Sequence, residues 1–554
     1  MAMRSARKNL KTSMHLSMMP DLGAGSDSAP IPTPIPSSDP TAGYLGHGLN
    51  RVRDQLDPGH GPSPNPNRAV TGERLATGLG GGSRCSICRT ASELAQALQR
   101  QSGASLSALG MLPLLGGKMA FYRSLRTTVF SLSVVVQAWR TTHAGRLVQP
   151  QLAPGLEPPQ TLEAVHAFVQ LYGDSLITEA ELGAECVGVF TFRSESREQA
   201  ERVEQALRAG GLVHGFQLGG DLHRSLEQAS RSSATTIDFH YAVWGCSTTP
   251  SLRPDTLVAY ALGFGQEAID RPILLNLASE GYETLAQLGS LFQPVAANRE
   301  LFTGRNGLLR QRQRLEEIIN QCDSVADTLS CYGLAPDPEL APQRQRVREA
   351  IAAIASLGDR YRQAPALPLQ APDPASLALN SPRLQVRLND GERMGGGGGE
   401  PFGYPDRGNA VARRRRLVRV GLRAGSRIDQ IRLRYHQEPA GAADEWIEEV
   451  HGGLGGRDSG SIDLGPGVCL ERIEARSGVP DGRVDQLWLT SSDGQRLGGG
   501  AGRGSNRSLD WQPGANQVLL GFQGRSKAEL DALRAVIATF EPLAWEPVRP
   551  EEDD

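Results

Sequence analysis

The fold of the last third of the chain is decided by its glycine-rich opening, Gly395-Gly396-Gly397-Gly398-Gly399-Glu400-Pro401-Phe402. Its closing segment is Gly521-Phe522-Gln523-Gly524-Arg525-Ser526-Lys527-Ala528-Glu529-Leu530-Asp531. Between the two lie short alternating apolar segments, separated by Gly and Asp turns, which predict an all-β domain. We expect the two ends to converge on one site, because glycine lets a backbone approach a ligand closely.

Three segments inside this region have the patterns of strands. Ile428 to Tyr435 and Val484 to Thr490 alternate apolar and polar residues, as half-buried strands do. Val518 to Phe522 is apolar throughout and predicts a strand buried on both faces. His451 to Gly456 contains four glycines and predicts a tight turn. Together these segments predict a β domain over residues 385–540.

The region resembles the jacalin-related lectins. The resemblance covers residues 395–536 and implies a β-prism of three small sheets with one carbohydrate site at one end. The residues that carry it are the opening glycine run with Phe402, Gly452-Gly453-x-Gly455-Gly456, Leu470-Glu471-Arg472-Ile473, Val484-Asp485-x-Leu487-x-Leu489-Thr490 and Gly521-Phe522-x-Gly524-Arg525.

The resemblance also implies which residues form the sugar site. In that family a glycine near the start of the domain pairs with the aspartate of a terminal Gly-x-x-x-Asp loop. By position these are Gly399 and Asp531, and the loop between the strands supplies Lys527, Ala528 and Glu529. A carboxylate accepts hydrogen bonds from neighbouring sugar hydroxyls, while backbone N–H groups donate to other sugar oxygens.

Lys527 stands where the family has glycine, and this departure leaves the outcome open. A lysine at this position either strains the loop, fills the pocket, or places an ammonium beside an acidic sugar. In the alternative interpretation Asp531 only caps the terminal strand, and the prism is inert towards sugars or binds a protein.

A second resemblance covers residues 43–290. The segment Phe168 to Gly183 ends a helix at Tyr172-Gly173 and continues as a strand. It is similar to the signature of the membrane-attack-complex/perforin superfamily, in which a helix, Tyr-Gly-Thr-His and a strand follow in that order. Asp174 and Ser175 stand where that family prefers Thr and His, and Ala184 replaces the second glycine of a common pair.

Other fragments of this region resemble the same family, and together they imply an α+β fold with a bent antiparallel sheet and helical clusters. These fragments are Leu45 to Asn50, Ser92 to Leu98 and Arg271 to Tyr282.

In the perforin family two helical clusters unfold into amphipathic β-hairpins, so lipid-facing and lumen-facing residues must alternate. Leu212 to Glu227 alternates, with His214 and Arg224 interrupting its apolar face, and Ser105 to Leu112 alternates weakly. Ser196 to Arg208 follows helical spacing instead. A charge on the lipid face costs about 2–4 kcal/mol. Two hypotheses therefore stand: a glycan-targeted membrane-binding or pore-forming protein, and a non-lytic lectin or adhesion protein.

Periodicity predicts the remaining elements. Two runs at helical spacing, within residues 300–363, predict an antiparallel helical hairpin. We expect disorder over residues 1–42, a Pro-rich linker over 364–384 and an acidic, frayed tail over 541–554. The other predicted elements are a half-buried strand over Val129 to Trp139, a helix over Thr161 to Tyr172, separate strands over Ser175 to Leu182 and Cys186 to Phe192, a helix over Arg197 to Arg208, and strands over Thr236 to Gly245 and Ile273 to Leu277.

Length and charge bound the function. A chain of 554 residues predicts about two to four domains. Its net charge of −3 gives no global basic field, so we expect no nucleic-acid partner. The local run Arg413 to Arg416 either holds a phosphate or lipid headgroup or lies in solvent on a strand edge or loop. Met1 to Pro20 lacks the apolar core of a secretory signal. Non-classical secretion and residence in the cytoplasm until release both stay open.

The chain shows no catalytic or metal-binding constellation. Its seven cysteines are odd in number and sparse, so no disulfide framework is expected. Cys85-Ser86-Ile87-Cys88 lacks the second ligand pair that a zinc site needs, which favours two free thiols at the start of a helix. We therefore predict a protein that is not an enzyme and has no cofactor. Its expected partners are glycans or glycolipids, a membrane surface and further copies of itself, because one lectin site alone binds weakly.

Overall fold

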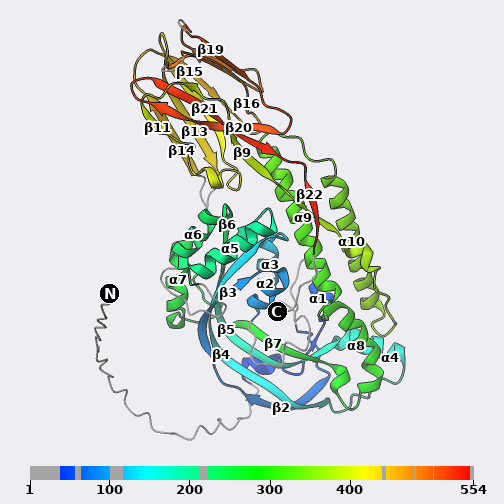
Figure 1. The fold of residues 1–554 in the computed structure, drawn as a ribbon. Helices are drawn as coiled ribbons and strands as arrows, with labels where there is room; N and C mark the ends of the chain where they lie inside the picture. The colour runs from blue at the N-terminus through cyan, green and yellow to red at the C-terminus, as the bar shows by residue number, and fades with distance from the viewer. Residues whose placement is uncertain are drawn as a thin grey trace, which may run out of the picture.

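The computed structural model describes residues 38–56, 64–99, 117–211, 222–438, 445–478, 482–502 and 505–548. Its N-terminal region is α+β, with an antiparallel sheet and long helices (Figure 1). Its C-terminal region is all-β and contains several antiparallel sheets. The fold class predicted for each part is confirmed at this level of detail.

The N-terminal sheet is built around two long neighbouring strands. These are β4 (Leu132–Leu152) and β5 (Ser175–Arg193), which pair antiparallel from Leu132↔Phe192 to Arg146↔Glu179. The seven strands are β1 (Gly48–Leu49), β2 (Val70–Ala76), β3 (Gly81–Cys88), β4 (Leu132–Leu152), β5 (Ser175–Arg193), β6 (Thr236–Trp244) and β7 (Ile273–Gly281).

The prediction of separate strands on either side of Gly183 is wrong, because β5 runs through it without a break. One half of β5 pairs with β7 and the other half with β6. A Cβ at Gly183 would overlap the carbonyl oxygen of Arg140 on β4. The glycine therefore serves the close approach of two strands rather than the end of one.

The predicted half-buried strand is buried on both faces. Val135 of β4 packs in the same apolar cluster as Leu94, and Val134 packs in a second cluster with Leu207. The polar residues Ser133 and Gln137 are also buried. Helices cover both faces of the sheet. The alternation of apolar and polar residues along this strand therefore does not mark one face as solvent-exposed.

Two helical pairs connect neighbouring strands of this sheet. One pair, α2 (Ala91–Leu98) and α3 (Gly117–Ser124), lies in the chain between β3 and β4. The other, α5 (Arg197–Ala209) and α6 (Leu222–Ser233), lies between β5 and β6. The helix predicted over Arg197 to Arg208 is confirmed.

The two other candidate hairpin segments lie wholly or partly outside the described residues. All of Ser105 to Leu112 lies outside them, and so does the first part of Leu212 to Glu227. From Leu222 onward the latter segment is helical, as part of α6. No described helix is long and apolar enough to cross a membrane.

Cys85 and Cys88 lie in β3 and not at the start of a helix as predicted, since α2 begins only at Ala91. Both thiols are buried. Among the described residues, no group of three or more His, Cys, Asp or Glu side chains is placed to hold a metal ion.

We expect these two thiols to resist iodoacetamide at pH 8 in the folded protein. Burial raises the pKa of Cys85 to about 12 and that of Cys88 still further, so almost no reactive thiolate forms. Peptide mass spectrometry after brief alkylation measures this, with the guanidinium-denatured chain as the control in which both react. Labelling of either thiol in the folded protein would contradict the burial.

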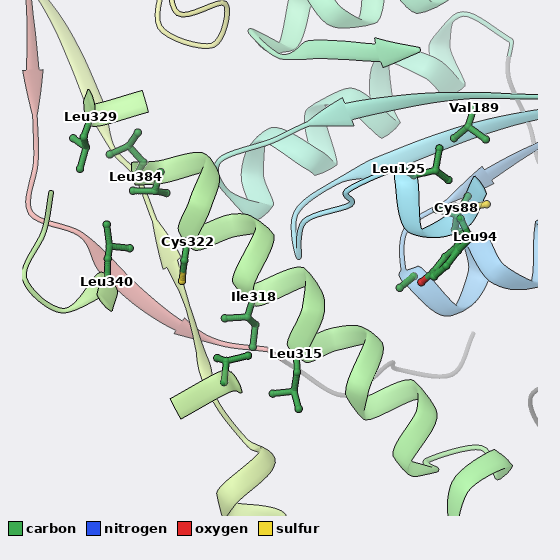
Figure 2. Packing of buried hydrophobic residues seen from close by; sticks show 14 of the residues in the cluster. Cys88, Leu94, Leu125, Val189, Leu315, Ile318, Cys322, Leu329, Leu340 and Leu384 are labelled. Carbon is green, nitrogen blue, oxygen red and sulfur yellow. The ribbon is translucent and has the colours of Figure 1, made fainter. Parts of the chain in front are cut away.

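The predicted helical hairpin is confirmed as α9 (Leu308–Cys331) and α10 (Leu340–Gln363), which follow α8 (Gly289–Thr303). The two long helices run between the N-terminal sheet and the C-terminal sheets (Figure 1). Leu315, Ile318 and Cys322 lie along one side of α9 and belong to the same buried cluster as Leu94 (Figure 2). The helices therefore share one apolar core with the N-terminal sheet.

The predicted linker and tail both contain regular structure within their described residues. Within residues 364–384 lie α11 (Pro374–Leu377) and β8 (Asn380–Arg383). The tail contributes β22 (Ala544–Pro547), which pairs with β8 in an antiparallel two-stranded sheet. Arg383 of β8 forms ion pairs with Glu546 (2.7 Å) and with Glu198 of α5 (3.0 Å).

The C-terminal region consists of three antiparallel sheets, the arrangement of a β-prism. The strands predicted over Ile428 to Tyr435, Val484 to Thr490 and Val518 to Phe522 are confirmed. They lie within β13 (Ile428–Gln437), β17 (Val484–Ser491) and β20 (Gln517–Ser526). The first sheet contains β9 (Val386–Asp390), β10 (Met394–Gly395), β11 (Glu400–Phe402), β20 (Gln517–Ser526) and β21 (Leu530–Phe540). The second contains β12 (Arg416–Ala424), β13 (Ile428–Gln437), β14 (Glu445–Gly452) and β15 (Arg457–Asp463). The third contains β16 (Leu470–Ser477), β17 (Val484–Ser491), β18 (Arg496–Gly499) and β19 (Arg507–Trp511).

The arginine run is neither a solvated loop nor a free anion site at its centre. Arg415 is 1% exposed and its Nε donates to Oε1 of Gln437 at 2.7 Å. Arg414 forms an ion pair with Glu438 (2.7 Å) and donates to Oγ1 of Thr328 on α9 (3.2 Å). The Arg414 side chain therefore joins the prism to the helical hairpin, while the Arg415 side chain is held within the prism.

Candidate binding site at one end of the prism

The fold brings Gly399 and Asp531 together. β10 pairs with β21, and N of Gly396 donates to the carbonyl oxygen of Asp531 at 3.0 Å. A Cβ at Gly398 would lie 2.6 Å from Oδ1 of Asp531, and one at Gly399 would overlap Oδ2. Gly399 has a φ of +65°, which favours glycine. The glycine loop thus wraps closely around the carboxylate.

Arg525 fixes the glycine loop from the neighbouring strand. Its Nε donates to the carbonyl oxygen of Gly398 at 2.8 Å, and its Nη2 donates to that of Gly399 at 2.7 Å. With the carbonyls turned to this guanidinium, the loop is held in one conformation beside Asp531. Arg525 could have been identified from the sequence, because it is the last residue of the motif Gly521 to Arg525 that carries the family resemblance.

The loop from Lys527 to Glu529 forms a tight turn between β20 and β21, in which N of Lys527 donates to the carbonyl oxygen of Glu529 at 3.1 Å. The backbone of Lys527 does not adopt the left-handed conformation, so this position does not require glycine. Lys527 and Ala528 are both exposed. The lysine therefore does not strain the loop, and its side chain is exposed.

Two arginines that sequence reasoning missed occupy the same end of the prism. Arg483 forms ion pairs with Glu529 (2.5 Å) and with Oδ1 of Asp531 (3.4 Å). Arg427 reaches the same Glu529 carboxylate at 3.3 Å. Desolvation acts to raise the pKa of Glu529, but hydrogen bonds and charge from these arginines lower it overall. The Glu529 side chain is thus engaged by protein groups.

Asp531 itself is 6% exposed. It offers carboxylate oxygens as acceptors, beside the close backbone of Gly398 and Gly399 and the guanidinium of Arg483. Of the predicted site residues, the structure brings all five to one end of the prism. Two of them, Gly399 and Asp531, are in direct contact, while Lys527 and Ala528 lie on the exposed turn.

Comparison with known proteins identifies this region. Residues 391–536 match the family model described as the Jacalin-like lectin domain. Comparison with curated proteins gives no match.

Several solved lectin structures are similar to the same part of the chain. AcmJRL, a mannose binding jacalin related lectin from Ananas comosus, is 22% identical, with a TM-score of 0.22, and the match covers 27% of this chain and 96% of that chain. Malaysian banana lectin is 22% identical, with a TM-score of 0.21, covering 28% and 99%. The artocarpin–mannotriose complex is 18% identical, with a TM-score of 0.22, covering 27% and 97%. Residues 391–536 are a jacalin-like lectin domain, and the N-terminal region has no family assignment.

Proposed function

We propose that this protein binds carbohydrate through its jacalin-like domain, at the end of the prism where Asp531 meets the glycine loop. The observation that carries the proposal is the contact of Gly398 and Gly399 with the Asp531 carboxylate. It places an acceptor for two neighbouring hydroxyls beside a backbone without side chains, so a pyranose ring could approach closely. No enzymatic step forms part of the proposal.

Arg483 adds a condition to this binding. Its Nε lies 3.4 Å from Oδ1 of Asp531, where it competes with a sugar hydroxyl for the same oxygen. A bound sugar must therefore share this carboxylate with the guanidinium or displace it towards Glu529, its other partner.

We expect Asp531→Asn to weaken glycan binding by about tenfold to a hundredfold, because a hydrogen bond to a charged group contributes about 1.5–3 kcal/mol. The full chain is first screened on a glycan array, and the strongest glycan is then titrated by calorimetry. Asp359→Asn, an exposed substitution on α10, is the matched control and should bind like the parent chain. Equal binding by the Asp531 variant, or no bound glycan at all, would exclude this site.

A second proposal is that glycan binding delivers the N-terminal region to a membrane. The observation in its favour is that both helical pairs connect strands that already pair side by side, β3 with β4 and β5 with β6. An extended helical pair could therefore continue two existing strands as a hairpin. Against it, α5 carries charges on most of its surface and buries only Val203 and Leu207.

Dye release from liposomes decides between this membrane step and a non-lytic lectin. The liposomes carry a glycolipid that displays the glycan found on the array, and liposomes without it are the control. Release confined to the glycolipid-bearing liposomes, together with ring-like oligomers, supports the membrane step. Binding without release supports the non-lytic lectin or adhesion protein.

A further inference from the structure

A cavity lies where the prism meets the second helical pair of the N-terminal region. Its volume is about 180 Å³. Its walls come from α6, from β5 and the start of β6, from the first residue of α7 (Pro254–Gly263), and from the prism loop that contains the short helix η4 (Arg407–Asn409). Figure 1 shows α6 and β6 at the end of the N-terminal region that faces the C-terminal sheets. The residues that line this cavity are not those of the candidate sugar site.

The cavity lies between two apolar cores. Leu226 of α6 and Ile237 of β6 line it and belong to the buried cluster that also contains Val134. Ala410, which follows the lining residue Asn409, belongs to the other cluster, which extends from the helical hairpin into the prism. Apolar packing therefore does not close this junction, and most of the side chains that line the cavity are polar or charged.

Asn409 places a buried hydrogen-bond acceptor at this cavity. The residue is 3% exposed, and its Nδ2 donates to Oδ1 of Asp406 at 2.8 Å. An ionised carboxylate only accepts hydrogen bonds, so Nδ2 must be the atom turned towards it, and Oδ1 points elsewhere. Among the residues that the structure describes, no group donates to this buried Oδ1. Because buried polar groups are nearly always hydrogen-bonded, this oxygen is placed to accept from a bound molecule.

Charged groups of both signs line the same cavity, and the ion pairs that they form are long. Oε1 of Glu227 on α6 lies 3.4 Å from Nε2 of His223, and its Oε2 lies 3.4 Å from Nη2 of Arg231. Oδ2 of Asp406 lies 3.7 Å from Nη2 of Arg415. Strong charge-assisted hydrogen bonds are about 2.7–2.9 Å long. Both carboxylates can therefore form shorter contacts with a ligand than they form with the protein.

Arg413 adds a positive charge from the same prism loop. Its backbone N donates to the carbonyl oxygen of Asn409 at 2.9 Å, and its Nε donates to the carbonyl oxygen of Glu438 at 3.3 Å. The backbone of the prism thus holds this guanidinium beside the cavity, which it helps to line. The fork of a guanidinium matches a carboxylate in geometry. One turn of the loop therefore presents an acceptor at Asn409 and a cation at Arg413.

The charges that line the cavity select the class of ligand. Glu227 and Asp406 repel a simple anion, and Arg413 and Arg231 repel a simple cation. A molecule with both an ammonium and a carboxylate complements both sets, and an ammonium supplies three donors for Oδ1 of Asn409 and the carboxylates near it. A cavity of about 150 Å³ holds a benzene molecule. A volume of about 180 Å³ therefore suits a molecule of the size of an amino acid.

We propose that this cavity binds a free α-amino acid at the junction of the prism and α6. The ammonium of the ligand donates to Oδ1 of Asn409 and is balanced by Glu227, and the ligand's carboxylate accepts from the guanidinium of Arg413. The side chain of the ligand packs against Leu226 and Ile237. The bound amino acid thereby ties α6 to the prism loop. The inference does not depend on glycan binding by the prism.

The test uses the full chain and the standard set of L-amino acids. Thermal unfolding identifies the amino acids that stabilise the chain, and calorimetry then measures the Kd of the strongest. We expect Asn409→Leu and Arg413→Gln each to weaken binding by about tenfold or more, because each removes a hydrogen bond to a charged group of the ligand. Arg419→Gln, an exposed substitution on β12 outside the cavity, is the matched control and should bind like the parent chain. In the parent chain, bound amino acid should also slow hydrogen exchange in α6 and in residues 406–413, a result that requires no variant to fold.

Analogues of the strongest amino acid separate the two proposed contacts. The amine without the carboxylate and the acid without the ammonium, each with the same side chain, should bind at least about tenfold more weakly. Equal binding by either analogue, or by Arg413→Gln, would overturn the site. So would a chain that no amino acid stabilises, or slowed exchange confined to other segments. Methyl mannoside and inorganic phosphate are the neutral and anionic probes, and slowed exchange in α6 with either of them in place of the amino acid would also overturn the proposal.

Discussion

Asp174→Ala is expected to lower the free energy of unfolding by about 3–5 kcal/mol, because it removes a buried negative charge that stabilises two buried arginines. Asp174 is 1% exposed, and Arg51 and Arg299 beside it are almost equally buried. Oδ1 of Asp174 accepts from N of Arg51 at 3.1 Å, and Oδ2 accepts from the hydroxyl of Tyr361 on α10 at the same distance. Without the carboxylate, two buried guanidinium groups lose a counter-charge.

The pKa of Arg299 reports the same dependence. Burial acts to lower it, but the charges of Asp174 and Glu283 outweigh burial and raise it. Guanidinium denaturation measures the loss of stability. Tyr361→Phe is the matched control, since it removes one hydrogen bond and should cost about 1 kcal/mol. A loss of no more than this in Asp174→Ala would mean that the arginines find other partners.

Lys118→Met is the second substitution with a large expected effect, also about 3–5 kcal/mol. Nζ of Lys118 lies 2.6 Å from Oε2 of Glu185, and the two side chains are 4% and 0% exposed. The same ammonium donates to the carbonyl oxygens of Leu98 on α2 (3.2 Å) and Leu275 on β7 (3.0 Å). Methionine fills the space but leaves a carboxylate buried without its cation.

The double variant Lys118→Met/Glu185→Leu is the control for this prediction. Replacing both charges with apolar groups is often close to neutral, so most of the stability should return, apart from the unpaired amide of Gln137. Denaturation gives the free energies, and hydrogen exchange shows whether α2 and α3 open first. A double variant as unstable as Lys118→Met would show that packing, and not the charge, is lost.

Local patterns predicted much of the C-terminal fold. Alternation in Ile428 to Tyr435 and the glycines of Gly452 to Gly456 depend on neighbours in the sequence, so both could be placed without a structure. The positions of Gly399 and Asp531 came from a family resemblance and lie in contact as that resemblance implies.

Contacts between distant segments could not be predicted. Arg427 and Arg483 reach Glu529 only because three sheets close around one axis, and no local pattern reports this. The pairing of β8 with β22 joins two short segments that each look like linker. Arg415 was expected on the surface because a charged run is usually solvated, yet its partners come from elsewhere in the prism.

The β8–β22 pairing has a mechanical consequence for the jacalin-like domain. Because the chain both arrives at and leaves the prism through one small sheet beside α9, the prism is anchored by two strands and resists swivelling. β21 carries Asp531 near its first residue and ends at Phe540, whose ring lies 5.4 Å from that of Tyr332 at the end of α9. At about 3.3 Å per residue this strand holds the helices roughly 30 Å from Asp531. A glycan bound near Asp531 would therefore fix the orientation of the whole protein relative to that glycan, because the prism is joined rigidly to the helices.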